Sequence, residues 1–471
     1  MPHRALDPLR IPDEFWGRHD VVATLRARDV GALFRLLRRH TGASQTQLGI
    51  AVGLGQGYVS RIIAGRKVIA IDVLERVADG LGMPDEARLA LGLAPCRPSS
   101  LTPMAHSPSR PAVGSWQGTV GRAVEFWRGD VERRDVLRYG AFSAAGYTLP
   151  ALQWFTSDGD VPAAKAGRRA IGQPDVDMIR EMTGTLRQLD NQYGGGRTRA
   201  TVARYLSGDI APLLHDGRFD ETTGRALLSA AAETTQLAGW MAYDSGEHSV
   251  AQRYLIHALD LARAAGDHPL GAEILAAMSH QATYLGDATT AVDLARAAGR
   301  TARQAGVRVL VAEAAVMEAH AHARGGDGRA CAVSLSHAEQ ALDRADRSRD
   351  PQWISYFDTA YMSAKFGHCF RELGQAKQAE HFAVQSLRMD SRYVRGRTFN
   401  LLLLATAHAQ QGDCERACAS GSQALTLMAQ MQSARAVEYL RVLQEKLARH
   451  ARTPVVRQFN GHVTATIGRR A

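Results

Sequence analysis

The sequence predicts an all-α protein with a small N-terminal helical domain and a long C-terminal array of helical hairpins. Apolar residues recur at helical spacing through most of the 471 residues, which is the pattern of amphipathic helices. Glycines recur at intervals of about forty residues in the C-terminal half, as in stacked repeats. A stretch rich in proline and serine, residues 95–115, separates the two parts. A chain of this length has room for about three domains with buried cores.

The most informative local pattern is a pair of short helices between residues 44 and 67. Ser44 is a good N-cap for the first helix, because its hydroxyl accepts a hydrogen bond from an unpaired N–H group. Leu48 lies on the apolar side of that helix, and Gly53 marks the turn after it. Val59 and Ile62 then give the second helix its apolar face. The pattern predicts two helices joined by a tight turn.

The charge around this helix pair indicates a partner with phosphate groups. Between residues 30 and 71, a stretch of 42 residues, the chain has six basic residues and no Asp or Glu. A surface that neutralises phosphates needs such unopposed cations. This local excess is more informative than the net charge of +10, because arginine-rich composition is common in GC-rich bacterial genomes. The six residues are Arg35, Arg38, Arg39, Arg61, Arg66 and Lys67.

Residues 30–92 resemble the Xre class of helix-turn-helix domains, to which phage repressors belong. The residues that carry this resemblance are Ser44, Gln45, Leu48, Ala51, Gly53, Val59, Ser60, Arg61, Ile62, Gly65 and Arg66. The resemblance implies a lambda-repressor-like fold of five helices. It also implies that a recognition helix runs from about Gln56 to Ile63 and that its first residues enter the major groove of double-stranded DNA.

The resemblance further implies a set of DNA-binding residues, namely Gln45, Gln56, Gly57, Tyr58, Ser60, Arg61, Arg66 and Lys67. Gln56 is expected to pair with an adenine, because an amide offers the donor and the acceptor that the adenine edge requires. Gln45 and the three cations are expected to bind phosphates, which position a domain without reading the sequence.

Three glycines, Gly49, Gly55 and Gly57, depart from the family pattern. Glycine weakens a helix by about 1 kcal/mol relative to alanine, and Gly57 leaves a base-facing position without a side chain. We therefore expect the same fold with weaker sequence readout. The alternative interpretation of this region is a helical hairpin that binds protein.

Composition divides the chain into six segments. Prolines mark an N-terminal arm, and the proline- and serine-rich stretch is too poor in apolar residues to fold, which predicts a linker. The residues after about 450 lose the helical pattern, which predicts a loose tail. The predicted segments are 1–28 (arm), 29–94 (helix-turn-helix domain), 95–118 (linker), 119–174 (connecting helical segment), 175–450 (helical repeats) and 451–471 (tail).

The helical repeats are marked by glycines that precede an alanine by five residues. The pairs are Gly246/Ala251, Gly286/Ala291, Gly325/Ala330, Gly374/Ala379 and Gly412/Ala417, with spacings of 40, 39, 49 and 38 residues. This pattern resembles tetratricopeptide (TPR) repeats with unusually long helices, and it implies a TPR-like α-solenoid. Such a solenoid presents a concave groove to a peptide or protein ligand. Candidate groove residues, which would serve equally well as core residues, are Trp240, Tyr243, Tyr284, His320, Tyr361 and Asn400.

A glycine-rich segment, Q-Y-G-G-G-R-T-R at residues 192–199, allows two interpretations. Backbone N–H groups at a helix start can cradle a phosphate. However, no Lys-Ser/Thr pair follows the glycines and no strand precedes them, so the segment does not match a P-loop. The simpler interpretation is a flexible turn before a helix that begins near Arg199.

The sequence offers little support for catalysis, metal binding or membrane insertion. The five cysteines are scattered, which favours a reducing cytosol over a disulfide framework, and no apolar run is long enough to span a membrane. We therefore expect no enzyme activity, no cofactor, no metal and a cytoplasmic location. The sets of His and Cys residues that lack a standard zinc spacing are His320, His322 and Cys331, and His408, Cys414 and Cys418.

Residues 132–137 contain a pair of arginines before a mildly apolar stretch, as in a twin-arginine export signal. Export signals lie at the N-terminus, whereas this segment lies far inside the chain. We therefore expect a connecting helix. An exported repeat protein becomes the alternative if translation begins near Val113.

Together these patterns predict a cytoplasmic transcriptional regulator that binds double-stranded DNA. An Xre-type domain on a TPR-like body resembles large actinobacterial helix-turn-helix regulators and bacterial regulators that sense peptide pheromones. By this analogy the body is expected to form a homodimer, to sense a peptide, small ligand or protein partner, or to do both. The alternative is a protein-interaction scaffold in which the helix-turn-helix domain is only an adaptor.

Overall fold

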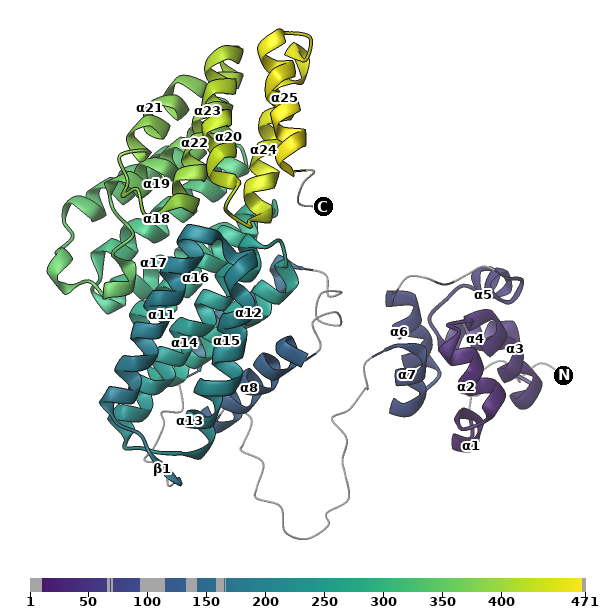
Figure 1. The fold of residues 1–471 in the computed structure, drawn as a ribbon. Helices are drawn as coiled ribbons and strands as arrows, with labels where there is room; N and C mark the ends of the chain where they lie inside the picture. Colours follow the sequence, from purple (N-terminus) through teal and green to yellow (C-terminus); the bar gives the residue numbers. More distant parts are fainter. Residues whose placement is uncertain are drawn as a thin grey trace. The chain divides into compact units, whose positions relative to one another are not determined.

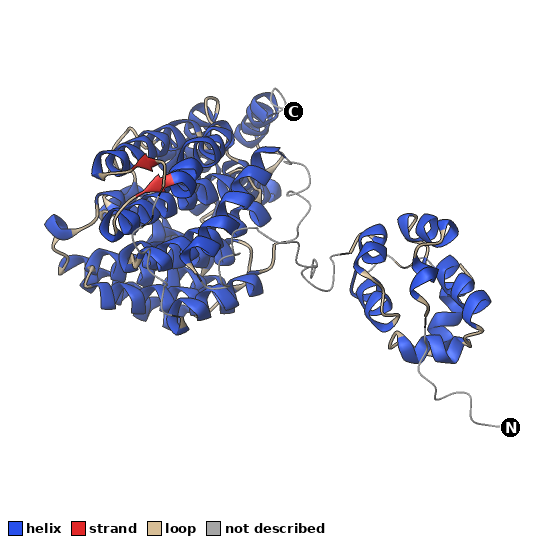
Figure 2. Ribbon diagram, turned by 90° about the horizontal axis from the view of Figure 1, so that it is seen from below, coloured by secondary structure: helices blue, strands red, loops and turns tan. Residues whose placement is uncertain are grey.

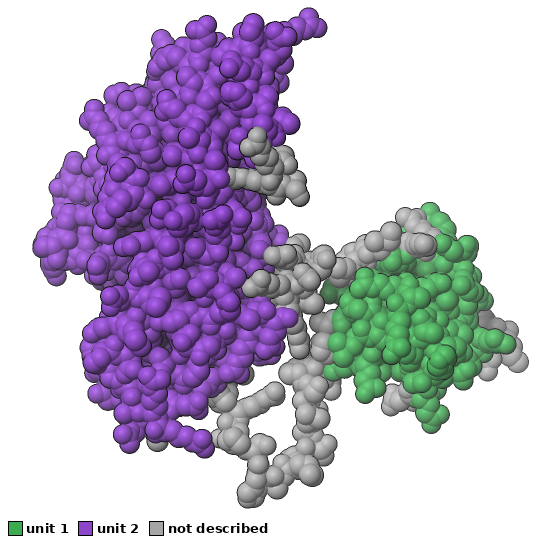
Figure 3. Space-filling view, in the orientation of Figure 1, with its two compact units in different colours: residues 1–109 green, residues 110–471 purple. Residues whose placement is uncertain are grey.

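The computed structural model describes residues 11–65, 68, 71–93, 115–132, 142–157, 165 and 167–467 (Figure 1). Helices dominate the described chain, as the all-α prediction requires (Figure 2). The described strands, β1 (Arg169–Ala170) and β2 (Gly217–Arg218), form a short parallel pair. The chain divides into two compact units, residues 1–109 and 110–471, which we call the head and the body (Figure 3).

The described part of the head is a bundle of short helices around one apolar core. The helices are α1 (Asp13–Trp16), α2 (His19–Arg26), α3 (Val30–Thr41), α4 (Gln45–Ala51), α5 (Gln56–Ile63), α6 (Ile71–Gly80) and α7 (Asp85–Leu91). Asp29 caps α3 by accepting a hydrogen bond from the Ala32 N–H, and Gly42 ends that helix in the left-handed conformation.

The predicted N-terminal arm is wrong for residues 11–28. Helices α1 and α2 lie in this stretch, and they bury Phe15, Trp16, Val21 and Leu25 in the head core. The prolines were misleading, because Pro12 immediately precedes α1 and does not interrupt it. The folded head therefore includes part of the segment that composition assigned to an arm.

Antiparallel helix pairs form the larger part of the body and stack one after another (Figure 1). The pairs are α14 (Glu221–Asp244) with α15 (His248–Ala265), α16 (His268–Tyr284) with α17 (Ala288–Ala305), α18 (Arg308–Arg324) with α19 (Gly328–Asp343), α20 (Thr359–Glu372) with α21 (Ala376–Ser386), and α22 (Val394–Gln410) with α23 (Cys414–Met428). Two further helices, α24 (Ala434–Leu447) and α25 (Pro454–Ile467), stack on α22 and α23. The 3₁₀ turns between these helices are η3 (Arg347–Arg349), η4 (Gln352–Ile354) and η5 (Ala448–His450).

Each of these pairs turns at a glycine with a positive φ, which is the conformation that favours glycine. The third turn differs from the predicted one, because Gly326 has a φ of 79° whereas Gly325 ends α18 in the right-handed conformation. In three pairs an aspartate after the glycine caps the second helix. The turning glycines are Gly246, Gly286, Gly326, Gly374 and Gly412.

Other helices precede the stacked pairs. They are α8 (Trp116–Glu132), the 3₁₀ turn η1 (Ala144–Tyr147), α10 (Thr148–Thr156), α11 (Gln173–Tyr193), α12 (Gly195–Tyr205), the π-helical turn η2 (Leu206–Ile210) and α13 (Ala211–Asp216). Helix α8 packs against α12 and α15, and α10 packs against α15 and α17. Helix α8 begins inside the predicted linker, because Trp116 and Val120 belong to the body core. Most of the linker, 95–114, and the twin-arginine pair at 133–134 lie outside the described residues.

The predicted loose tail is wrong for residues 454–467, which form α25. Val456, Phe459 and Val463 are buried in the core of the last helices. Their spacing of three and four residues is helical, but the polar residues between them hid this short pattern in the sequence. Phe459 packs over Gly421, where a Cβ would lie 2.8 Å from the ring.

The C-terminal helices are hydrogen-bonded to the junction of α11 and α12, near the N-terminal end of the stacked helices. The Gln432 N–H donates to the Tyr193 carbonyl at 2.8 Å, and the Gly196 N–H donates to the Gln432 carbonyl at 3.1 Å. The Arg395 guanidinium of α22 donates to the Asn191 side chain at 3.1 Å. Segments about 200 residues apart in sequence are therefore hydrogen-bonded to each other.

Candidate nucleic-acid interface

Helices α4 and α5 are joined by a tight turn, as the sequence predicts. Ser44 and Gln47 cap α4 reciprocally, because the Gln47 N–H donates to Ser44 Oγ at 3.1 Å and the Ser44 N–H donates to Gln47 Oε1 at 3.0 Å. Gly53 turns the chain with a φ of 64°. Val59 and Ile62 are buried in the head core, so the opposite side of α5 faces solvent.

Close backbone contacts explain one of the three departures from the family pattern. A Cβ at Gly49 would lie 2.6 Å from the carbonyl oxygen of Leu54, so a side chain there would push α4 away from the turn. Gly55 and Gly57 are different, because no heavy atom lies within 4 Å of a Cβ built on either of them. Gly49 is therefore required by the packing, whereas Gly57 leaves an exposed position of α5 without a side chain.

Two predicted site residues meet at the start of α5. Gln45 and Gln56 are the first residues of α4 and α5, and Gln56 is exposed. The Gln56 Nε2 donates to Gln45 Oε1 at 3.1 Å. An amide has two N–H donors and an oxygen acceptor, so Gln56 keeps one donor and its acceptor for a partner. The hydrogen bond also restrains the side chain, which lowers the entropy lost on binding.

The remaining predicted residues that the structure describes lie along α5. Gly57 and Arg61 are exposed, and Tyr58 and Ser60 are half-buried. The Arg61 guanidinium lies over the Tyr58 ring, 5.6 Å from its centre, in a cation–π contact. This contact holds the Arg61 charge along the exposed side of α5.

Arg35 has a role that the sequence analysis missed. Its Nη1 donates at 2.6 Å to the carbonyl of Ile63 at the end of α5, where helix carbonyls lack partners within the helix. Arg35 therefore ties α3 to α5 and fixes the direction of α5. In the sequence, Arg35 was noticed only as one of the basic residues in a stretch without acidic residues. That pattern indicated a phosphate contact and not a contact with the end of α5. The predicted contacts Arg66 and Lys67 lie outside the described residues.

A small helical bundle with a capped helix, a tight turn and an exposed second helix defines the class of helix-turn-helix domains. Comparison with protein families agrees with this assignment, because residues 29–91 match the model of a helix-turn-helix domain. The matched residues cover α3 to α7 of the head. No curated protein matches the chain.

The glycine-rich segment of the body is a packing site. A Cβ at Gly195 would lie 2.4 Å from the carbonyl oxygen of Met241. The Gly195 N–H donates to Asp244 Oδ2 at 3.1 Å, and the Gly196 N–H is bonded to a carbonyl of the turn before α24. These N–H groups are used within the protein and do not cradle a phosphate. Helix α12 begins at Gly195, earlier than the predicted start near Arg199, and the turn is tightly packed.

Three of the predicted groove residues pack against one another. The Tyr243 ring lies 5.5 Å from the rings of both Trp240 and Tyr284. The guanidinium of Arg435, from α24, lies 4.2 Å from the centre of the Tyr243 ring and 5.3 Å from that of Tyr284. The aromatic residues thus surround a cation supplied by the protein itself.

The other predicted groove residues are also packed within the body. His320 stacks on His368, with 5.9 Å between the ring centres. The Asn400 amide donates to the Ser386 carbonyl at 3.1 Å. The Tyr361 ring packs edge to face on the Tyr356 ring, with 5.2 Å between the ring centres. All of them serve as packing residues in this structure.

A polar cluster that the sequence analysis did not find joins the first helices α16, α18 and α20 to the segment that precedes α20. The Tyr356 hydroxyl lies 3.0 Å from Glu273 Oε1 and 2.6 Å from Glu313 Oε1. Burial and the neighbouring Glu273 raise the pKa of Glu313 well above its ordinary value. Burial and the Arg435 charge lower the pKa of Lys365 to about 7. The cluster therefore favours the neutral forms of Glu313 and Lys365.

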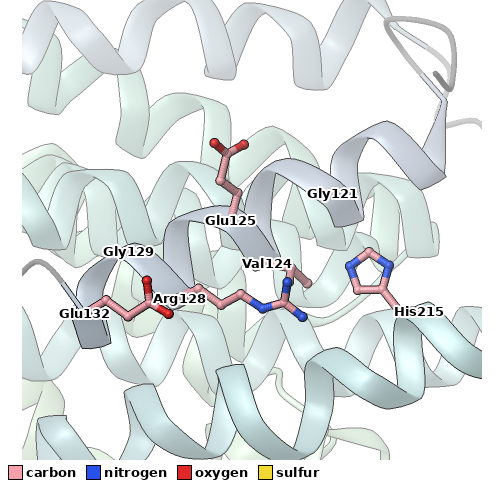
Figure 4. A pocket seen from close by; sticks show the side chains of 7 residues that line it. All are labelled: Gly121, Val124, Glu125, Arg128, Gly129, Glu132 and His215. Atoms are coloured by element: carbon pink, nitrogen blue, oxygen red, sulfur yellow. The ribbon is translucent and has the colours of Figure 1, made fainter. Parts of the chain in front are cut away.

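A hollow of about 370 Å³ lies along α8 (Figure 4). Its lining combines both signs of charge, and Glu125 points away from Arg128 in Figure 4. Among the residues that the structure describes, no group of three or more His, Cys, Asp or Glu side chains is arranged to hold a metal ion. No described helix is long and apolar enough to cross a membrane. The hollow is lined by Gly121, Val124, Glu125, Arg128, Gly129, Glu132 and His215.

Proposed function

We propose that this protein is a cytoplasmic transcriptional regulator that binds double-stranded DNA sequence-specifically through its head, as a homodimer formed by its body. The observation that carries the proposal is the Gln45–Gln56 hydrogen bond at the exposed start of α5. A glutamine held in this position offers a donor and an acceptor to an adenine edge in the major groove. The surrounding stretch without acidic residues supports binding to phosphates on either side.

The proposed contacts divide into base reading and positioning. Gln56 reads a base, and the neighbouring positions of α5 line the major groove. The phosphate-binding residues are Gln45, Arg61, Arg66 and Lys67, which position the head without reading sequence. The exposed, side-chain-free position of Gly57 supports modest specificity for a single head.

The body is proposed to be a TPR-like solenoid that pairs two heads. The glycine turns and the consecutive stacking of helix pairs support this assignment. One head reads only a few base pairs, so we expect an inverted repeat whose half-sites lie about one helical turn, 10–10.5 base pairs, or a multiple apart. A peptide or protein ligand of the body would regulate binding only through different affinities for different shapes of the dimer.

Selection of binding sites from random DNA, followed by fluorescence anisotropy at several salt concentrations, tests the proposal. Gln56→Ala should weaken binding to the selected site by about 1–3 kcal/mol and relax the preference at one base position. An unchanged ratio of specific to nonspecific affinity in this variant would show that α5 does not read bases through Gln56.

Arg61→Ala is the matched control on the same helix. It should weaken binding to all sequences alike. The slope of log affinity against log salt should become shallower by about one unit, because one phosphate contact is lost. Thermal unfolding of both variants separates these effects from loss of fold. If the wild-type chain selects no DNA sequence, the scaffold interpretation, with the head as an adaptor, is favoured instead.

A further inference from the structure

Helix α11 has two apolar stripes on different sides. The inner stripe consists of Val176, Ile179, Thr183 and Leu186, which are buried. It packs against α14, where Thr183 Oγ1 lies 2.7 Å from Thr234 Oγ1. This stripe is the normal core side of a repeat helix.

The outer stripe consists of Met178, Met182, Thr185 and Leu189, and all four are exposed. The exposed fractions of the three apolar side chains are 54%, 43% and 38%. Their spacing of four, three and four residues is the spacing of a coiled-coil seam. An exposed apolar stripe of this regularity indicates a surface made for another helix.

The place of α11 in the body explains why this stripe is exposed. A solenoid buries both sides of every helix pair except at its ends, which need a polar cap. The first pair is α11 with α12, and α8 covers α12. Helix α11 packs against α12, α14 and α22, and its outer stripe remains on the surface. The N-terminal end of the solenoid is therefore only half covered.

We propose that a second copy of this chain covers the outer stripe, with the two α11 helices antiparallel about a two-fold axis. In this register Met178 lies opposite Leu189 of the second copy, and Met182 lies opposite Thr185. The flanking Glu181 lies opposite Gln188, so no like charges oppose each other across the seam. The stripe itself carries no charge. This inference rests on the proposed homodimer and gives it a surface.

A second exposed apolar face, on α10, is a weaker candidate. It consists of Leu149, Leu152 and Phe155 on a helix of nine residues. The Arg300 guanidinium already lies over the Phe155 ring, 5.3 Å from its centre. The α11 stripe is longer, uncharged and self-complementary, and these properties favour a two-fold partner.

Sedimentation velocity of the full chain without DNA, at concentrations from about 1 to about 100 µM, tests the surface. This range is chosen because a seam of one helix per chain is expected to give a dimer of low affinity. The wild-type chain should dimerise. Met178→Glu should raise the dissociation constant by about tenfold or more, because each added carboxylate faces Leu189 of the other copy. Leu189→Lys should act in the same direction.

The double variant Met178→Glu with Leu189→Lys should restore the dimer, because each new charge then faces its opposite across the axis. The two positions are about 16 Å apart along one helix at 1.5 Å per residue, so they cannot pair within one chain. Leu152→Glu on α10 is the matched control and should leave the dimer intact. Circular dichroism and thermal unfolding report whether each variant is folded.

Several outcomes would overturn the inference. These are a monomeric wild-type chain over the whole range, a folded Met178→Glu variant that still dimerises normally, or a double variant that stays monomeric. Dissociation by Leu152→Glu alone would transfer the interface to α10. DNA binding is measured separately, so a monomer that still selects a DNA site would refute this interface and leave the proposed DNA-binding function standing.

Discussion

Single glycines decide how closely the segments of the body approach one another. At Gly195 a Cβ would lie 2.4 Å from the Met241 carbonyl oxygen and 2.8 Å from the Met241 Cα. Both atoms belong to the backbone of α14, so neither can rotate away. We expect Gly195→Ala to destabilise the body by about 1–3 kcal/mol, as overpacking usually does, measured by chemical denaturation.

Gly184→Ala is the control for this substitution. Gly184 lies in the middle of α11, and no heavy atom lies within 4 Å of a Cβ built there. Alanine at this position should leave stability unchanged or raise it by about 1 kcal/mol through helix propensity. If the two variants were equally stable, the close approach at Gly195 would not constrain the fold.

Among the elements, α8 is held to the solenoid by a buried charge network. Asp130 is only 2% exposed, and its Oδ2 accepts hydrogen bonds from Arg199 Nη1 at 2.6 Å and from the Tyr254 hydroxyl at 2.7 Å. Asp130→Ala leaves the buried Arg199 with one carboxylate fewer. Since removing one partner of a buried ion pair typically costs 3–5 kcal/mol, we expect a loss of about 3 kcal/mol, at the lower end because Arg199 keeps Glu247 at 2.7 Å.

Glu132, at the exposed end of the same helix, supplies the matched control. Glu132→Ala should change the free energy of unfolding by less than about 0.5 kcal/mol, as surface substitutions usually do. Urea denaturation of both variants gives the comparison. Equal losses would mean that α8 is not anchored through Asp130.

At the scale of the whole molecule, buried histidines make the stability of the body depend on pH. Burial is the main cause that lowers the pKa of His257 to about 4 and that of His320 to about 3. Burial also lowers the pKa values of His280 and His368 well below 6.5. In the unfolded chain these histidines bind protons near pH 6.5. Their contribution to stability is therefore lost as the pH falls below about 6.5.

Acidic groups act in the opposite direction. Burial raises the pKa of Asp190 to about 6, so its contribution to stability rises as the pH falls towards its ordinary value of 3.8. Burial also raises the pKa of Glu313. A single-residue comparison isolates the histidine effect from these carboxyl groups.

As the pH falls from about 6 to about 4, we expect the free energy of unfolding to decrease less in His320→Gln than in the wild type. On unfolding, the wild type should take up about one proton more than the variant. The slopes of the free energy of unfolding against pH should therefore differ by about 1.4 kcal/mol per pH unit. Urea midpoints measured at intervals across this range give the result. Parallel curves for the two proteins would show that His320 is not kept neutral by its surroundings.

Part of the polar cluster around Tyr356 corresponds to a pattern that is visible in the sequence. Glu273 precedes His280 by seven residues, and Glu313 precedes His320 by the same interval, on the first helices of neighbouring pairs. Seven residues are about two helical turns, so each Glu and His share one face. This repeated pair could have been read from the sequence. The polar cluster itself could not be predicted, because Tyr356 lies in the segment before α20 and Lys365 lies on α20.

The sequence by itself determined the features that depend on neighbouring residues. The helical class, the Ser44 cap, the turn at Gly53 and the glycine turns of the body all follow from interactions over a few residues. The head was also recognisable, because its turn and its charge lie within one short stretch. Its match to a helix-turn-helix domain confirms that part of the interpretation.

Only the tertiary structure decided which surfaces meet. Arg395 and Asn191 are 204 residues apart and hydrogen-bonded. The glycine-rich segment at the start of α12 is hydrogen-bonded to the turn that contains Gln432. Helical periodicity shows that a residue has an apolar side but not which segment covers that side. For this reason the arm and the tail seemed unfolded, and the glycine-rich segment was interpreted as a flexible turn although it is tightly packed.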